Sequence, residues 1–135
     1  MQPSKCRFGY FEAQFLGHIV SKEGIKTDPK IIDAVQEFKP PKNLKQLRSF
    51  LGLTNYYRKF VSNYTNIVKS LYELLQKDVP FEWSKECQTA FESLKEKLIT
   101  APVLVHFSEK HPVVIHTDAS GYGIGAVIAH IINNK

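Results

Sequence analysis

The spacing of the apolar residues changes along this chain, and that change limits the folds it can adopt. Between residues 29 and 99, apolar side chains recur every three or four positions, which is the period of helices with one buried face. In the segments on either side they flank glycine-containing turns or alternate with other residues, which is typical of strands. We therefore predict an α+β fold with a short N-terminal strand pair, about four helices and a C-terminal β-hairpin.

Turn and capping residues indicate where the first elements begin and end. Short apolar runs flank the turn Ser21-Lys22-Glu23-Gly24, which predicts two strands joined by that turn. Asp28 and Pro29 then supply an N-cap and a first-turn proline for a short helix. The pair Pro40-Pro41 ends this helix.

The second predicted helix, capped by Asn43, carries a polar row opposite its apolar stripe. Successive members of this row are three or four positions apart: Lys45, Arg48, Gly52, Asn55 and Lys59. A glycine inside a helix costs ~1 kcal/mol relative to alanine, and here it removes bulk between basic side chains. A phosphate chain or groove floor could therefore approach the backbone closely. The alternative is a solvated surface whose glycine packs against another helix.

Positive charge is concentrated in the first half of the chain, whose sequence pI is near 9.2. Residues 1 to 76 contain 12 basic and 6 acidic side chains, whereas residues 77 to 135 contain 6 and 7. No acidic residue lies between Glu37 and Glu73, an interval with seven lysines and arginines. A stretch whose charged side chains are all basic predicts a polyanionic partner, with nucleic acid as the first candidate.

Two further helices are predicted, one from about Tyr64 to Gln76 and one after the cap Ser84, and their polar outer faces indicate structural roles. Cys6 and Cys87 lack metal-binding or disulfide-frame spacing, so we predict reduced thiols. No run has the character of a signal peptide or membrane span. We expect an intracellular protein, in the cytoplasm or nucleus and not secreted, with no membrane and no small-molecule substrate as partner.

Asp118 follows the alternating run VVIHT and precedes a glycine-rich turn. We predict a strand that ends at Asp118, a turn to Gly123 and a partner strand over residues 124 to 128. An aspartate in this position is either a turn-forming residue or a metal ligand at the end of a strand. His116 and His130 are expected to be structural or surface groups, because imidazole is a poor ligand for magnesium.

Several ordered blocks of this sequence resemble the Pol polyproteins of gypsy-class long-terminal-repeat retrotransposons. The blocks are KCRF, FLGHIVSKEGIKTDPKII, LRSFLGLTNYYRKFV, FEWSKECQTAF, APVL and HTDASGYGIGAVI. The resemblance implies four regions: the end of the reverse-transcriptase palm with its strand pair (1–28), a thumb-like helical region (29–78), a connection (79–111) and the truncated start of a ribonuclease H-like sheet (112–135).

The resemblance also implies roles for particular residues. LRSFLGLTNYY looks like the thumb helix that lies along the minor groove of the template-primer duplex. Lys45, Arg48, Gly52, Asn55, Tyr56 and Lys59 would then contact nucleic acid, either a template-primer duplex or an RNA-DNA hybrid. Asp118 looks like the first of four carboxylates that hold two Mg²⁺ ions for phosphodiester hydrolysis.

Catalysis by this chain alone is not expected. Two cations ~4 Å apart need several carboxylates, and in the family the partners of Asp118 come from later elements. The palm aspartates, in the tetrapeptide Tyr-x-Asp-Asp, are also absent from this sequence. Mg²⁺ is therefore expected in the intact family enzyme, and no cofactor is expected to bind tightly to this chain alone.

Two functional hypotheses follow from the sequence. In the first, the chain is a fragment of a reverse transcriptase and ribonuclease H polyprotein, and it supplies template-primer binding and the connection beside the rest of the polyprotein. In the second, it is a non-catalytic basic nucleic-acid-binding module, or an inert interaction module, from a decayed element.

Overall fold

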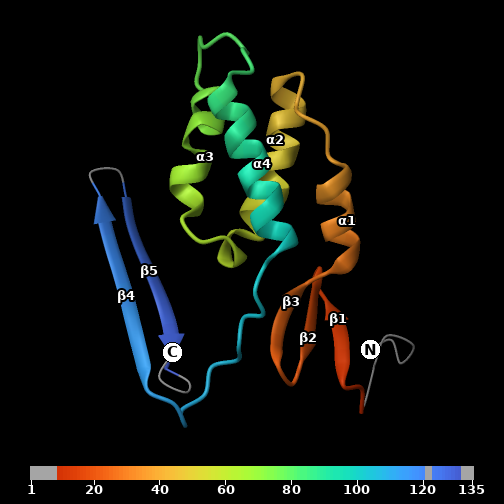
Figure 1. Ribbon diagram of the computed structural model, residues 1–135, viewed down its shortest axis with the longest axis vertical. Helices are drawn as coiled ribbons and strands as arrows, with labels where there is room; N and C mark the ends of the chain where they lie inside the picture. The colour runs from red at the N-terminus through yellow and green to blue at the C-terminus, as the bar shows by residue number, and fades with distance from the viewer. Residues whose placement is uncertain (1–8, 121–122, 132–135) are drawn as a thin grey trace. The chain divides into compact units, whose positions relative to one another are not determined.

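The computed structural model describes residues 9–120 and 123–131, and it divides into two compact units. The first unit extends to Leu104 and the second begins at Val105. The first unit contains a sheet and all the described helices, and the second contains a hairpin (Figure 1). The predicted α+β class with a C-terminal hairpin is confirmed.

The N-terminal sheet contains the expected strand pair and one further strand. β2 (His18–Ser21) and β3 (Gly24–Thr27) pair antiparallel around the predicted turn, and β1 (Glu12–Phe15) pairs with the other edge of β2. Ile25 and Leu104 exchange backbone hydrogen bonds of 2.8 and 2.9 Å, so the segment that follows the last helix returns to β3. Gly24 adopts φ +142°, and a Cβ there would collide with the Leu104 carbonyl.

The described α-helices are α1 (Pro29–Glu37), α2 (Leu44–Tyr56), α3 (Tyr64–Glu73) and α4 (Lys85–Ile99). Three of them, α1, α2 and α4, begin at the predicted caps. The side chains of Asp28, Asn43 and Ser84 each accept a hydrogen bond from a first-turn backbone N–H. Two boundaries differ from the prediction. α3 ends at Glu73 rather than at about Gln76. α2 ends at Tyr56, and a 3₁₀ turn, η2 (Arg58–Phe60), follows it, so Lys59 lies beyond the helix.

The core of the first unit lies between the helices, and aromatic side chains are at its centre. Phe50 of α2 is fully buried, and its ring centroid is 4.6 Å from that of Phe91 on α4 and 5.2 Å from that of Phe38 after α1. Burying one such side chain contributes about 2 kcal/mol, which exceeds the worth of an exposed ion pair. Packing against α4 therefore fixes which face of α2 points outward.

The second unit contains β4 (Val113–Ser120) and β5 (Gly123–His130), which pair antiparallel. The strand was expected to end at Asp118, but β4 continues to Ser120, and Asp118 pairs with Gly125. The prediction was too short because antiparallel pairing extends past Asp118 as far as Ser120 and Gly123. Among the described residues, no helix is long and apolar enough to cross a bilayer.

Candidate nucleic-acid interface

The outer face of α2 presents the polar row that the sequence predicts. Lys45, Arg48, Gly52 and Asn55 are all exposed, while the side chains on the opposite face of the helix are buried. Neither Lys45 nor Arg48 forms an ion pair with a described residue. Their charges are therefore not offset locally, and α2 has no acidic residue in its first turn.

Gly52 faces open space in the middle of this row. A Cβ added there would meet no described atom within 4 Å. Gly52 therefore does not pack against another helix among the described residues. The gap leaves the α2 backbone accessible between Arg48 and Asn55, whose side chains project on either side of it.

The last turn of α2 is joined to the turn between β1 and β2. The Tyr56 hydroxyl donates a hydrogen bond to the Leu16 carbonyl (2.6 Å), and the Tyr57 hydroxyl donates one to the Gly17 carbonyl (2.8 Å). Leu16 and Gly17 both have positive φ, +46° and +74°, which forms a tight hairpin turn. Tyr56 is 52% exposed, so it has both this structural role and a surface that a ligand could reach.

His18 lies among the aromatic rings at this junction. Its ring stacks on Tyr56 at 5.4 Å with an interplanar angle of 8° and also contacts Tyr57 and Phe60. Its Nδ1 atom is buried without a hydrogen-bond partner among the described residues. Burial, and then the nearby Lys59 ammonium, lower the His18 pKa from its ordinary value of 6.5. His18 is therefore neutral at pH 7.

Sequence reasoning missed this junction, although one signal for it was present. Two adjacent tyrosines at the end of a helix have polar tips that usually find hydrogen-bond partners. Their partners, however, are 40 positions away in the sequence, and no local pattern identifies them.

Lys59 joins the candidate surface from η2 rather than from α2. It is exposed, and its Nζ atom is 5.3 Å from the centroid of the Phe60 ring. The 3₁₀ turn contains two exposed cations, Arg58 and Lys59, and Lys59 is the one near His18. The last residue of the predicted row therefore belongs to η2 rather than to α2.

Asp118 lies in the other unit, exposed on β4. Its carboxylate is a hard oxygen ligand of the kind Mg²⁺ prefers. Among the described residues, however, no three His, Cys, Asp or Glu side chains come together in a way that could hold a metal ion. A single carboxylate does not form a two-metal site, and we derive no catalytic step from it.

The comparisons with known proteins agree in the type of protein they indicate. Residues 83–135 match the model of the RNase H-like domain found in reverse transcriptase. The chain is 38% identical over 126 residues to the transposon Tf2-3 and Tf2-4 polyproteins of Schizosaccharomyces pombe. That alignment covers 93% of the chain and 10% of each polyprotein, so the chain spans about a tenth of the length of these relatives.

The fold is also similar to solved reverse transcriptases. The foamy viral protease-reverse transcriptase in complex with double-stranded DNA matches with a TM-score of 0.75 and 28% identity, over 90% of this chain and 26% of that one. The same type of protein in complex with an RNA/DNA hybrid matches with a TM-score of 0.70 and 31% identity, over 82% of this chain and 15% of that one.

The environment of His18 leads to a prediction about pH. The lowered pKa means that the unfolded chain binds a proton more readily than the folded chain does, so the contribution of His18 to stability is fully present above pH 6.5 and is lost as the pH falls through the folded-state pKa. An NMR titration of the imidazole C–H signals, assigned with His18→Gln, should give a midpoint below 6.5.

The variant Lys59→Ala should raise this midpoint, because it removes the cation that opposes protonation. Lys22→Ala, on the exposed turn between β2 and β3, is the matched control and should leave it unchanged. A midpoint that does not respond to Lys59→Ala would exclude the electrostatic contribution of Lys59.

Proposed function

We propose that this chain, a retrotransposon-type sequence from the reverse transcriptase and ribonuclease H region of a polyprotein, binds the template-primer duplex along the exposed face of α2. Lys45, Arg48 and Lys59 pair with phosphates, Asn55 and Tyr56 contact sugar and base edges, and Gly52 lets the duplex approach. In the intact polyprotein this surface serves RNA-directed DNA synthesis, and the helical region acts as the thumb.

One observation carries the proposal: a row of unpaired cations flanks a glycine that faces open space. Lysine and arginine supply the sequence-independent, salt-sensitive part of nucleic-acid binding. A mid-helix glycine supplies close approach of the backbone. The solved relatives in complex with double-stranded DNA and with an RNA/DNA hybrid support duplex nucleic acid as the ligand class.

Asp118 is proposed to contribute one magnesium ligand to a ribonuclease H site in the intact polyprotein. The other carboxylates that two cations require would come from other parts of that protein. The isolated chain therefore acts in binding and in connecting two catalytic regions. It does not itself hydrolyse or synthesise nucleic acid.

The double variant Lys45→Ala/Arg48→Ala tests the binding surface. Removing one cation that pairs with a phosphate should reduce the slope of log K against log [salt] by about 1, so the double variant should lower it by about 2. The measurement is fluorescence anisotropy of a labelled RNA-DNA hybrid at several salt concentrations. Lys22→Ala/Lys110→Ala removes the same charge from exposed sites elsewhere and should change the slope far less. Equal slopes for both double variants would refute a localised surface.

Gly52 allows binding and stability to be separated. Gly52→Leu should raise the free energy of unfolding by up to ~1 kcal/mol, because leucine is the better helix former and the added side chain meets nothing within the described structure. The same variant should weaken hybrid binding about tenfold, because the side chain fills the gap between Arg48 and Asn55. Urea unfolding and anisotropy measure the two effects.

Thr65→Leu is the control for Gly52→Leu, since it adds a similar side chain to the exposed face of α3. It should leave hybrid affinity unchanged. Unaltered affinity in Gly52→Leu would show that the duplex does not approach the α2 backbone at this point.

The absence of turnover is tested with the 135-residue chain, Mg²⁺ and an end-labelled RNA-DNA hybrid. We expect no cleavage above the protein-free reaction, because one carboxylate cannot offset the charge of two cations. Asp118→Asn is the matched variant and should behave identically. Cleavage by the wild-type chain that disappears in Asp118→Asn would overturn the view that the site needs further carboxylates.

A further inference from the structure

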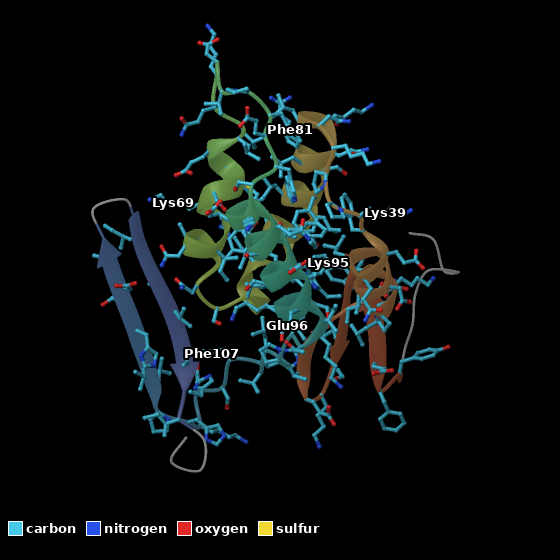
Figure 2. The ribbon with its side chains drawn as sticks, turned by 45° about the horizontal axis from the view of Figure 1, so that its top comes forward. Lys39, Lys69, Phe81, Lys95, Glu96 and Phe107 are labelled. Atoms are coloured by element: carbon cyan, nitrogen blue, oxygen red, sulfur yellow. The ribbon has the colours of Figure 1, made fainter. Side chains whose placement is uncertain are left out.

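An open groove of about 550 Å³ lies on the helical unit, next to the start of α2. Its lining comes from the α1–α2 connection and from the segment before α4: Lys39, Pro40, Pro41, Lys42, Phe81 and Trp83. In Figure 1 both connections reach the end of the helices opposite the three-stranded sheet. Figure 2 labels Lys39 and Phe81, one from each wall of the groove.

One wall is a pair of aromatic rings held in place by the core. Phe81 and Trp83 are stacked, with centroids 6.3 Å apart and an interplanar angle of 27°. The Trp83 Nε1–H donates a 2.7 Å hydrogen bond to Gln88 Oε1, and the indole meets the buried Phe91 ring edge-on at 6.0 Å. Both rings remain only partly buried. The wall is therefore pre-organised and still available to a flat ligand.

The other wall carries positive charge on a stiff backbone. Pro40 and Pro41 restrict the connection, and the Lys42 N–H is held by a 2.7 Å hydrogen bond to Gln46 Oε1. The Lys39 and Lys42 side chains are exposed and form no ion pair with a described residue. The acidic residues of these two connections, Asp78 and Glu82, are exposed, and neither lines the groove. The groove thus offers two cations beside two rings.

We propose that this groove binds a single-stranded segment of nucleic acid. An unpaired base stacks on the Phe81 and Trp83 rings, and the neighbouring phosphates pair with Lys39 and Lys42. Stacking on aromatic rings with lysines along the backbone path is the general chemistry of sequence-independent single-strand binding. A base inside a duplex has no free face to offer, so this groove and the α2 surface recognise different forms of nucleic acid.

Charge and continuity favour a nucleic acid over an acidic peptide. Lys42 directly precedes the α2 cap Asn43, and Lys45 and Arg48 follow on the exposed side of the first turns. One chain of phosphates could therefore pass from the groove to the α2 row. An acidic peptide would satisfy the lysines but would not need a paired aromatic wall.

Trp83 is the only tryptophan of the chain, so its fluorescence reports on this groove directly. Titration of the 135-residue protein with an oligothymidylate of about eight nucleotides at low salt should quench Trp83 emission in a saturable way. An oligoglutamate peptide of the same length and at the same concentrations should not. Quenching by both with equal affinity would identify an acidic-peptide groove and overturn the proposal, as would no response to the oligonucleotide.

Two variants test the two walls separately. Phe81→Leu removes one ring but keeps an apolar side chain, and it should weaken the oligonucleotide affinity about tenfold. Lys39→Ala/Lys42→Ala should weaken it by a similar factor and reduce its salt dependence. Lys22→Ala/Lys110→Ala is the matched control and should change the affinity less than about twofold. Far-ultraviolet circular dichroism of each variant checks that the fold is retained, because loss of the Phe81 ring can change Trp83 emission directly.

The two proposals can be refuted independently. Lys45→Ala/Arg48→Ala should weaken the affinity derived from Trp83 quenching less than Lys39→Ala/Lys42→Ala does, because the α2 row meets only the strand that leaves the groove. For the salt slope measured with a blunt hybrid, the order of the two double variants should be reversed. Oligonucleotide quenching that is insensitive to both Phe81→Leu and Lys39→Ala/Lys42→Ala would overturn the groove assignment and would leave the proposed duplex surface unaffected.

Discussion

The burial of one face of α2 is the constraint on which the rest of the first unit depends. Leu47 and Phe50 are fully buried, and Phe50 packs on Phe91 of α4. Each such side chain contributes about 2 kcal/mol, whereas an exposed ion pair contributes at most about 1. The apolar face therefore determines how α2 is rotated about its axis. Because the helix is short and regular, the same rotation places Lys45 and Arg48 outward.

A second set of contacts fixes the sheet to this helix. The hydroxyls of Tyr56 and Tyr57 donate hydrogen bonds to carbonyls of the β1–β2 turn, and His18 packs against both rings. A neutral His18 suits this position. Protonation would leave a buried Nδ1–H donor with no acceptor among the described residues, and Lys59 repels the charged form. The sheet turn and the cation of η2 consequently lie next to each other, at the C-terminal end of the α2 row.

Local signals in the sequence predicted most of what is local in the structure. Asp28, Asn43 and Ser84 are caps because a short polar side chain before an apolar period satisfies the free N–H groups at the start of a helix. The exposed row on α2 follows from the helical period alone. The end of α2 at Tyr56 was not predicted, because Tyr57 and Phe60 continue the apolar pattern of the helix. Both side chains are buried, although Tyr57 precedes the 3₁₀ turn and Phe60 lies within it. Features that depend on residues distant in the sequence could not be predicted from such local signals.

β1, for example, alternates polar and apolar residues over only four positions, too few to predict a strand alone, and it pairs with one edge of β2. The aromatic groove joins segments about 40 positions apart, and neither segment alone indicates a site. The roles of Asp118 and of the α2 row came from resemblance and remain proposals, since a single carboxylate or a charged helix face does not identify its ligand.

The glycines give the strongest argument that the α2 surface is more than solvated helix. Gly17 and Gly24 are required by the fold: both have positive φ, and a Cβ would collide with the Tyr57 hydroxyl at one and with the Leu104 carbonyl at the other. Neither positive φ nor a steric collision requires glycine at position 52. Gly52 is helical, and an added Cβ would meet no described atom within 4 Å. It costs the helix ~1 kcal/mol without a compensating contact in the described structure. A ligand that approaches the α2 backbone at this point would supply the missing contact. Because the nearby cations have no acidic partner among the described residues, that ligand is expected to be negatively charged.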